Sequence, residues 1–210
     1  MTTRVLPDPT HLRFAVLAAD VALFTVRDDQ LLVRVVNVNR PPFFKNVLGL
    51  PGGLLQPTET AEEAIERHIR EKAKITAPFV HSEQLYTFSQ VDRDPRGRVV
   101  AVAYVGLIPW DALSEAEKGS TPDASWQPAN KVKKLAYDHD AILTMALDRL
   151  RSRATYTTLI SKLMPREFTL TELQSMYETV LCTPLDKRNF RKKILKLNIV
   201  KPLQKERSDG

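Results

Sequence analysis

Apolar and β-branched residues in the first half of the chain fall into runs of strand length. Residues 14–26 form one such run, and residues 31–38 form a second run that follows two adjacent aspartates. Residues 85–90 and 98–108 repeat this arrangement on either side of the polar segment DRDPRG. Runs rich in β-formers that are separated by turn residues are typical of paired strands. The pattern therefore predicts two pairs of strands, with the strand over 14–26 mostly buried.

Helical signals separate and follow these strands. Thr60 and Glu63 have the spacing of a capping box, which predicts a helix that begins there and runs to about Lys74. Residues 138–151 predict a second helix, because apolar residues recur there at core spacing: Ile142, Met145, Ala146 and Leu150. The remaining segments are expected to be a proline-containing loop, a short strand end with a glycine turn, and a short helix with a loop: 39–46, 49–53 and 110–119.

The pattern changes after residue 153 to short helices alone. A first helix is expected over 156–164. Thr169 with Glu172 forms a second capping box for a helix to about residue 181, and Asp186 can cap a third helix to about residue 197. This change predicts a boundary between a first domain, 1–153, and a second domain, 154–210.

Composition and charge narrow the class of protein. The chain has 210 residues and a net charge of +6. Residues 155–210 hold 11 basic and 6 acidic residues, so a net charge of +5 lies in the second domain and favours a polyanionic partner for that part. There is no apolar run near the ~20 residues that span a bilayer, and no secretory signal. With the single cysteine, Cys182, these features predict a cytosolic protein without a membrane partner.

One segment, GGLLQPTETAEEAIERHIREKAKI over residues 52–75, resembles a Nudix box. The Nudix pattern is Gly, five residues, Glu, seven residues, then Arg-Glu-hydrophobic-any-Glu-Glu-any-Gly-hydrophobic. Six residues of this chain fall on the pattern: Gly53, Glu59, Arg67, Ile69, Glu71 and Ile75. Three positions depart from it, with His68 and Lys72 in place of glutamates and Lys74 in place of glycine.

These departures change the chemistry that the resemblance implies. In an intact box the carboxylates hold Mg²⁺ beside a diphosphate and activate water. Of the carboxylates that would bind the metal, only Glu71 is kept in this chain, with Glu59 as a candidate second ligand. We therefore expect no required cofactor, weak Mg²⁺ binding at most, and impaired or absent catalysis. Lys72 either contacts the diphosphate in place of the metal or simply lies at a solvated helix end, where a cation suits the helix dipole.

The whole chain resembles the Nudix-related transcriptional regulators of NAD metabolism, the NrtR family. The motifs that carry this resemblance are LGLPGG, YTFSQVDRDPRGRVVAVAYVGLIP, LAYDHDAIL with LDRLR, FTLTELQSMYETVL and LDKRNFRKKIL. The resemblance implies an α+β fold, with a Nudix α/β/α sandwich followed by a small winged helix-turn-helix domain. It also implies a homodimeric repressor that binds an ADP-ribose-like nucleotide in the first domain and double-stranded DNA with the second.

The resemblance also directs attention to residues near the expected nucleotide pocket. Arginines and aromatics hold phosphates and bases in Nudix domains that bind ADP-ribose. The candidates by position, together with the box, are Arg40, Phe43, Gly52, Gly53, Arg67, Glu71, Lys72, Phe88, Arg93 and Arg96. Each has a plain structural alternative, since DRDPRG is a polar turn in any case and Phe88 fits a core equally well.

The helix expected over 186–197 combines an apolar face with basic faces. Phe190, Ile194 and Leu197 recur at core spacing. A core-anchored helix of this kind can enter the major groove of DNA. The candidates for groove and phosphate contact are Lys187, Arg188, Asn189, Arg191, Lys192, Lys193, Lys201 and Lys205. Compared with the family, we expect the second strand of the wing to be missing and only residues 199–203 to be left for a first strand.

Two other functions remain open at this point. One is an active Nudix pyrophosphatase on ADP-ribose-like nucleotides with an unusual base. The other is a nucleotide-binding module that recruits protein partners through its winged helix.

Overall fold

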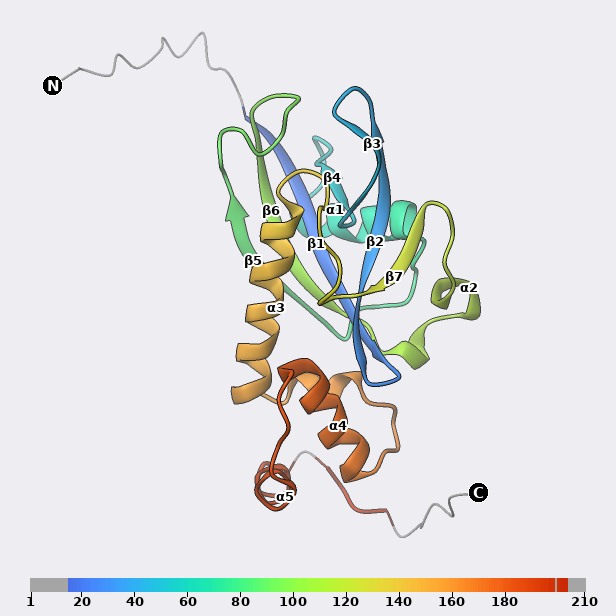
Figure 1. Ribbon diagram of the computed structural model, residues 1–210, viewed down its shortest axis with the longest axis vertical. Coiled ribbons are helices and arrows are strands. Elements are labelled where there is room, and N and C mark those ends of the chain that lie inside the picture. The colour runs from blue at the N-terminus through green and yellow to red at the C-terminus, as the bar shows by residue number, and fades with distance from the viewer. Residues whose placement is uncertain (1–14, 199, 204–210) are drawn as a thin grey trace, which may run out of the picture.

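Seven strands form one mixed sheet in the computed structural model, which describes residues 15–198 and 200–203. The strand order is β3-β2-β1-β6-β5, while β4 pairs with β1 and β7 pairs with β2 (Figure 1). β1 and β6 run parallel, and the other pairs are antiparallel. The strands are β1 (Val16–Arg27), β2 (Gln30–Arg40), β3 (Phe44–Gly49), β4 (Gly52–Leu54), β5 (His81–Phe88), β6 (Val99–Leu107) and β7 (Ala124–Pro128).

The helices lie on both faces of the sheet and below it. The α-helices are α1 (Ala61–His68), α2 (Glu115–Lys118), α3 (His139–Tyr156), α4 (Leu170–Leu181) and α5 (Lys187–Lys196). A π-helical turn, η2 (Ile69–Ala73), continues α1, and two 3₁₀ turns are η3 (Trp110–Ala112) and η4 (Leu159–Leu163). Figure 1 shows α3 lying along the sheet and α4 and α5 at its lower end.

Successive residues of β1 belong to two different hydrophobic cores, because side chains alternate between the two faces of a strand. Ala19, Val21 and Leu23 pack with the buried residues of α1 and η2. Ala22 and Phe24 belong to the other core, which includes Ile142, Leu143, Ala146 and Leu150 of α3. The sheet is therefore covered by a helix on each face, which confirms the expected α/β/α sandwich.

The second core continues into the C-terminal helices. It includes buried residues from η4, α4 and α5: Leu159, Ile160, Leu163, Leu173, Tyr177, Val180, Phe190 and Ile194. Helix α3 extends to Tyr156, so the expected domain boundary at 153/154 falls within its last turn. Where the domains divide stays a prediction, but the packing between them is apolar and continuous.

The β1–β2 hairpin is paired at only one end. Its turn, Asp28 and Asp29, has positive φ at both residues, and the strands pair from Arg27↔Gln30 to Phe24↔Val33. Beyond that point β1 pairs with β4 and β2 pairs with β3. The two strands therefore diverge away from the turn, which leaves room between them.

Several local expectations are corrected by the structure. The loop expected over 39–46 is shorter, since β2 extends to Arg40 and β3 begins at Phe44, and β7 has no counterpart among the expected strands. Residues 156–164 form only the 3₁₀ turn η4, because α3 takes the first of them. Residues 200–203 are not in a strand, while Ile199 and Lys205 lie outside the described residues. Leu197 is 46% exposed and is not a core residue.

The helix starts are as expected. Thr60 and Glu63 form a capping box at α1, Thr169 and Glu172 form another at α4, and Asp186 caps α5. No helix in the described part of the chain is both long enough and apolar enough to cross a membrane.

The backbone conformation of Lys74 explains why the Nudix pattern has glycine at this position. Lys74 ends η2 in the left-handed conformation, with φ 59° and ψ 42°. L-residues pay about 1–2 kcal/mol there, whereas glycine does not but loses more chain entropy on folding. We therefore expect Lys74→Gly to raise the free energy of unfolding by about 0.5–1 kcal/mol in denaturant titrations.

A lysine inside a regular helix serves as the matched control. Lys192 lies within α5, so Lys192→Gly is expected to lower the free energy of unfolding by about 1 kcal/mol. A loss of stability in both variants would contradict the conformational argument for Lys74.

Candidate functional site

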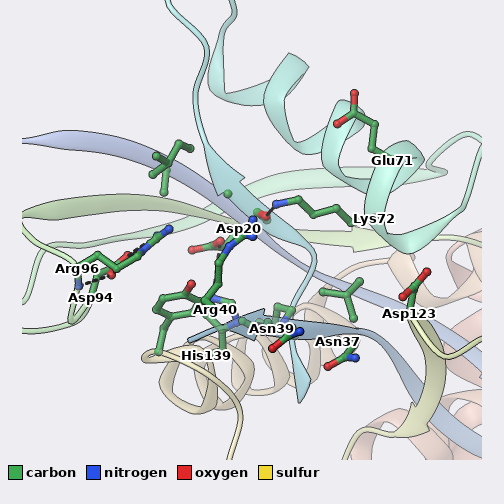
Figure 2. Close-up of a pocket in the computed structure, with 18 of the residues that line it drawn as sticks. Asp20, Asn37, Asn39, Arg40, Glu71, Lys72, Asp94, Arg96, Asp123 and His139 are labelled. Carbon is green, nitrogen blue, oxygen red and sulfur yellow. Dashed lines mark hydrogen bonds and ion pairs between the residues drawn. The ribbon is translucent and has the colours of Figure 1, made fainter. Parts of the chain in front are cut away.

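A cavity of about 520 Å³ opens where β1 and β2 diverge. Its walls come from β1, β2, the β4 turn, the end of η2, the β5–β6 loop, and the start of α3 (Figure 2). The polar and charged residues that line it are Asp20, Asn37, Asn39, Arg40, Glu71, Lys72, Lys74, Arg93, Asp94, Arg96, Asp123, Tyr137 and His139. The cavity is thus strongly polar and contains several cations.

The glycine turn brings the backbone close to the cavity wall. A Cβ atom on Gly52 would overlap the Asp20 carboxylate and the backbone of β1. A Cβ atom on Gly53, whose φ is 155°, would lie 2.6 Å from Lys72 Nζ and 2.9 Å from His68 Cε1. Only glycine fits at both positions, so the turn lies directly against residues 68 and 72 of the box.

Lys72 points from η2 into the cavity, where its ammonium group donates a hydrogen bond to the Gly52 carbonyl (Figure 2). Burial lowers the pKa of Lys72 below its ordinary value, and the nearby charge of Arg40 lowers it further, while Asp20 opposes both effects. An anionic ligand between Lys72 and Arg40 would stabilise both charges. The expectation of a merely solvated lysine is therefore not met, since Lys72 is half-buried in the cavity.

The remaining carboxylates of the box do not form a magnesium site. Both oxygens of Glu59 accept hydrogen bonds from Arg67, at 2.5 and 2.9 Å, and this pairing lowers the pKa of Glu59 to about 2. Glu71 is 56% exposed and lies 3.4 Å from Arg67. Across the described residues, no three His, Cys, Asp or Glu side chains are grouped to hold a metal. The donor set at 59 and 71 does not fit Mg²⁺, because Arg67 engages both carboxylates and the Lys72 ammonium lies against the glycine turn.

His68 is buried beneath the glycine turn and does not line the cavity. Burial lowers its pKa, and the charges of Lys72 and Arg67 lower it further. His68 therefore favours its neutral form, in which it cannot add a charge to the site.

A buried network supports the floor of the cavity. Arg93 has a side chain only 3% exposed, and it binds Asp138 at 2.6 Å and Asp20 at 3.3 Å. His139 Nδ1 accepts a hydrogen bond from the Leu50 backbone at 2.9 Å, and burial lowers the pKa of His139, which keeps the ring neutral. Arg93 thus ties β1 to the start of α3, and its guanidinium is already engaged by two carboxylates.

One end of the cavity is cationic and aromatic. Arg96 is held by Asp94 at 2.7 Å and lies over the Tyr137 ring at 5.4 Å, and Phe44 packs against the same ring at 4.5 Å. Arg40 also lines the cavity, and its guanidinium makes no hydrogen bond or ion pair with the part of the chain that the structure describes. This end offers flat surfaces and one uncommitted guanidinium.

The structure brings most of the expected site residues together. Seven of them line the cavity: Arg40, Gly52, Gly53, Glu71, Lys72, Arg93 and Arg96. Three do not, because Phe88 is buried in the core, Arg67 is paired with Glu59, and Phe43 is exposed outside the cavity. The phenol ring that lines the cavity is instead that of Tyr137, which the sequence analysis missed.

Other cavity residues were also missed, although some carried a signal. Asp20 is a lone carboxylate in an apolar strand, and Asn37 and Asn39 alternate at the end of a buried strand. Asp123 gave no signal, because β7 brings it beside β2 only in the folded chain.

The basic helix of the second domain has the expected polarity. Phe190 and Ile194 are buried, whereas Lys187, Arg188, Asn189 and Lys192 are exposed. Two candidates are already engaged, since Arg191 donates to the Thr171 hydroxyl at 3.4 Å and Lys193 donates to the Thr155 carbonyl at 2.9 Å. Lys201 is exposed and Lys205 lies outside the described residues.

Comparison with known proteins decides the family. Residues 16–146 match the NUDIX domain model, and residues 160–210 match the NrtR DNA-binding winged helix domain model. The chain is 32% identical over 198 residues to the ADPR responsive transcriptional repressor NtrR of Acinetobacter baylyi, covering 92% of this chain and 78% of that protein. The chain belongs to the NrtR family.

Two solved structures are similar to this chain, one over most of its length and one over the Nudix domain alone. The NrtR of Shewanella oneidensis complexed with a 27mer DNA has a TM-score of 0.78 at 31% identity, with 91% of this chain and 90% of that chain covered. The NUDIX domain of the same NrtR complexed with ADP ribose has a TM-score of 0.57 at 34% identity, covering 68% of this chain and 93% of that chain. A Nudix domain followed by a winged helix is therefore a shared feature of this chain and the relatives.

Proposed function

We propose that this chain is a transcriptional repressor of NAD metabolism that senses ADP-ribose, or a related NAD-derived nucleotide, in its Nudix cavity. It binds operator DNA through helix α5 of its winged helix. The proposal includes a homodimer in the cytosol that needs no metal cofactor. Support comes from the family relationship and from relatives that are described as responsive to ADPR or complexed with DNA and ADP ribose.

The observation that carries the sensor role is the ammonium group of Lys72 in the cavity. It lies where the Nudix pattern has a metal-binding glutamate, and it points at the space beside Arg40. Two cations can hold a diphosphate by charge-assisted hydrogen bonds. Because the carboxylates at 59 and 71 do not fit a metal, the diphosphate is held without being activated for hydrolysis.

The two domains are joined by contacts that can carry a signal. Ser175 of α4 donates a hydrogen bond to the Asp29 carboxylate at 2.5 Å, and Thr179 donates to the Asp29 carbonyl at 3.3 Å. Asp29 lies in the turn of the β1–β2 hairpin, whose strands form two walls of the cavity. A change in the spacing of β1 and β2 on ligand binding would therefore act directly on α4, which packs on α5.

The proposal predicts a ligand-dependent affinity for DNA. Fluorescence anisotropy of labelled DNA from upstream of the chain's own coding sequence is expected to report specific binding. Saturating ADP-ribose is expected to change that affinity by about 5- to 150-fold, the usual range of allosteric coupling. A ligand shifts the equilibrium only if it favours one of two arrangements of the domains. No DNA binding even at low salt, where phosphate contacts are strongest, would favour the recruitment of protein partners instead.

An assay of hydrolysis separates the sensor from a pyrophosphatase. Incubation with ADP-ribose and Mg²⁺ is expected to leave the nucleotide intact, because Lys72 and His68 replace carboxylates of the box. Release of AMP at ordinary enzymatic rates of about 1 s⁻¹ or more would overturn the assignment of a sensor without catalysis.

A further inference from the structure

The two ends of the cavity differ in chemistry. Figure 2 shows Arg96 and Asp94 at one end, Asp123 and Asn37 at the other, and Arg40 and Lys72 between them. The first end holds the Arg96–Asp94 ion pair and the Tyr137 ring, whereas the second holds the Asp123 carboxylate and the Asn37 amide. An elongated ligand can therefore bind in only one favourable direction.

The polar side chains at the second end are exposed or half-buried, and they are free to exchange water for a ligand. The Asp123 carboxylate and the Asn39 amide make no hydrogen bond or ion pair within 15–198 and 200–203. The Asn37 amide donates to Asn46 at 3.4 Å, which leaves its carbonyl oxygen as a further acceptor. Hydrogen-bond acceptors that line a cavity are suited to a ligand that brings several donors.

The backbone holds Asp123 firmly in this place. The Asn37 N–H donates to the Asp123 carbonyl at 2.7 Å, and β7 begins at the next residue and pairs with β2 through Val36↔Ala124. Ala124 also donates a hydrogen bond to the Thr121 hydroxyl at 3.1 Å. The carboxylate is therefore presented from a fixed turn, and little ordering is needed when a ligand binds.

We infer that the Asp123 end of the cavity recognises the terminal sugar of a nucleoside diphosphate sugar, and thereby distinguishes it from a free nucleoside diphosphate. The inference rests on the proposed function. Arg40 and Lys72 bind the diphosphate, and the ring of Tyr137 with Arg96 faces the base. The sugar then lies at Asp123, where its hydroxyls donate hydrogen bonds to the carboxylate and to the Asn37 carbonyl oxygen.

A free nucleoside diphosphate does not reach the Asp123 carboxylate in this arrangement. Its terminal phosphate lies at Arg40 and Lys72, so it brings no hydroxyl donors to Asp123. Changes at Asp123 are therefore expected to act on the binding of the nucleotide sugar and to spare that of the free nucleoside diphosphate.

Calorimetric titration of the full chain with ADP-ribose and with ADP tests this assignment. Asp123→Ala is expected to weaken ADP-ribose binding by about tenfold, since hydrogen bonds to a charged group are lost, and to leave ADP binding no weaker. Asp123→Asn, which keeps the shape of the side chain and one carbonyl acceptor, is expected to weaken ADP-ribose binding less than Asp123→Ala does and to leave ADP binding unchanged. Asp111→Ala, at an exposed residue outside the cavity, is the matched control and is expected to change neither affinity.

The outcomes separate this assignment from the proposed function. Tight binding of ADP-ribose by the unmodified chain, with equal losses for both nucleotides in Asp123→Ala, would place another part of the ligand at Asp123. Unchanged affinities in both Asp123 variants would also overturn the assignment. If the unmodified chain binds neither nucleotide, the proposed function fails, and the assignment fails with it.

Discussion

Replacing Lys72 with methionine is expected to weaken ADP-ribose binding by about 10- to 100-fold. The change removes a charge-assisted hydrogen bond to the diphosphate from a partly buried site, where such bonds are strongest. Methionine keeps an unbranched side chain of similar length, and burying a thioether costs less than burying an ammonium group. The variant is therefore expected to fold, and calorimetry measures the affinity directly.

Removal of metal ions tests the same role of Lys72. Because Lys72 supplies the charge that a metal supplies in an intact box, binding to the unmodified chain is expected to survive excess EDTA. The matched control is Lys45→Met, at an exposed residue of β3 that does not line the cavity. Equal affinities for Lys72→Met and the unmodified chain, or loss of binding with EDTA, would contradict the role of Lys72.

The second large effect is expected at the DNA-binding helix. Arg188 and Lys192 are exposed and lie one turn apart on α5, on the side away from Phe190 and Ile194. The double replacement Arg188→Ala with Lys192→Ala is expected to weaken binding to upstream DNA by about 10- to 100-fold at low salt. The ADP-ribose affinity of the free protein is expected to stay unchanged.

The salt dependence identifies what these side chains contact. Each phosphate contact contributes about −0.9 to the slope of log affinity against log salt, so the double variant is expected to flatten that slope by up to about 2. Lys131→Ala with Lys133→Ala removes the same charge from an exposed loop before α3 and serves as the control. A similar loss in the control would show that net charge, rather than α5, governs DNA affinity.

The sequence predicted the helix starts correctly, because a helix cap depends on residues that are close together in the chain. The capping boxes at Thr60 and Thr169 and the cap at Asp186 start helices as expected, since the partners lie three residues apart. The π-helical turn after His68 was not expected, because it follows from tertiary contacts at its end. There Arg34, fully buried in β2, donates two hydrogen bonds to the Ala73 carbonyl at 2.9 and 3.1 Å.

The candidate site was predictable only where it follows the Nudix motif. Gly52, Gly53 and Lys72 come together because the glycine turn and the helix belong to one motif, and spacing along the chain reveals them. Tyr137 lines the cavity because of the turn before α3, and Asp123 lines it because β7 pairs with β2. Both placements depend on contacts between residues that are far apart in the sequence. A ligand contact of Arg93, which lines the cavity, stays a prediction, whereas its ion pairs with Asp20 and Asp138 could not be read from the sequence.

The most direct test of the central claim compares DNA affinity with and without ligand in two proteins. Anisotropy titrations of upstream DNA would be run with the unmodified chain and with Lys72→Met, each with and without an ADP-ribose concentration that saturates the unmodified chain. The account predicts that the nucleotide changes the DNA affinity of the unmodified chain by about 5- to 150-fold and leaves that of the variant nearly unchanged. Equal DNA affinity of the unmodified chain with and without bound nucleotide would contradict it.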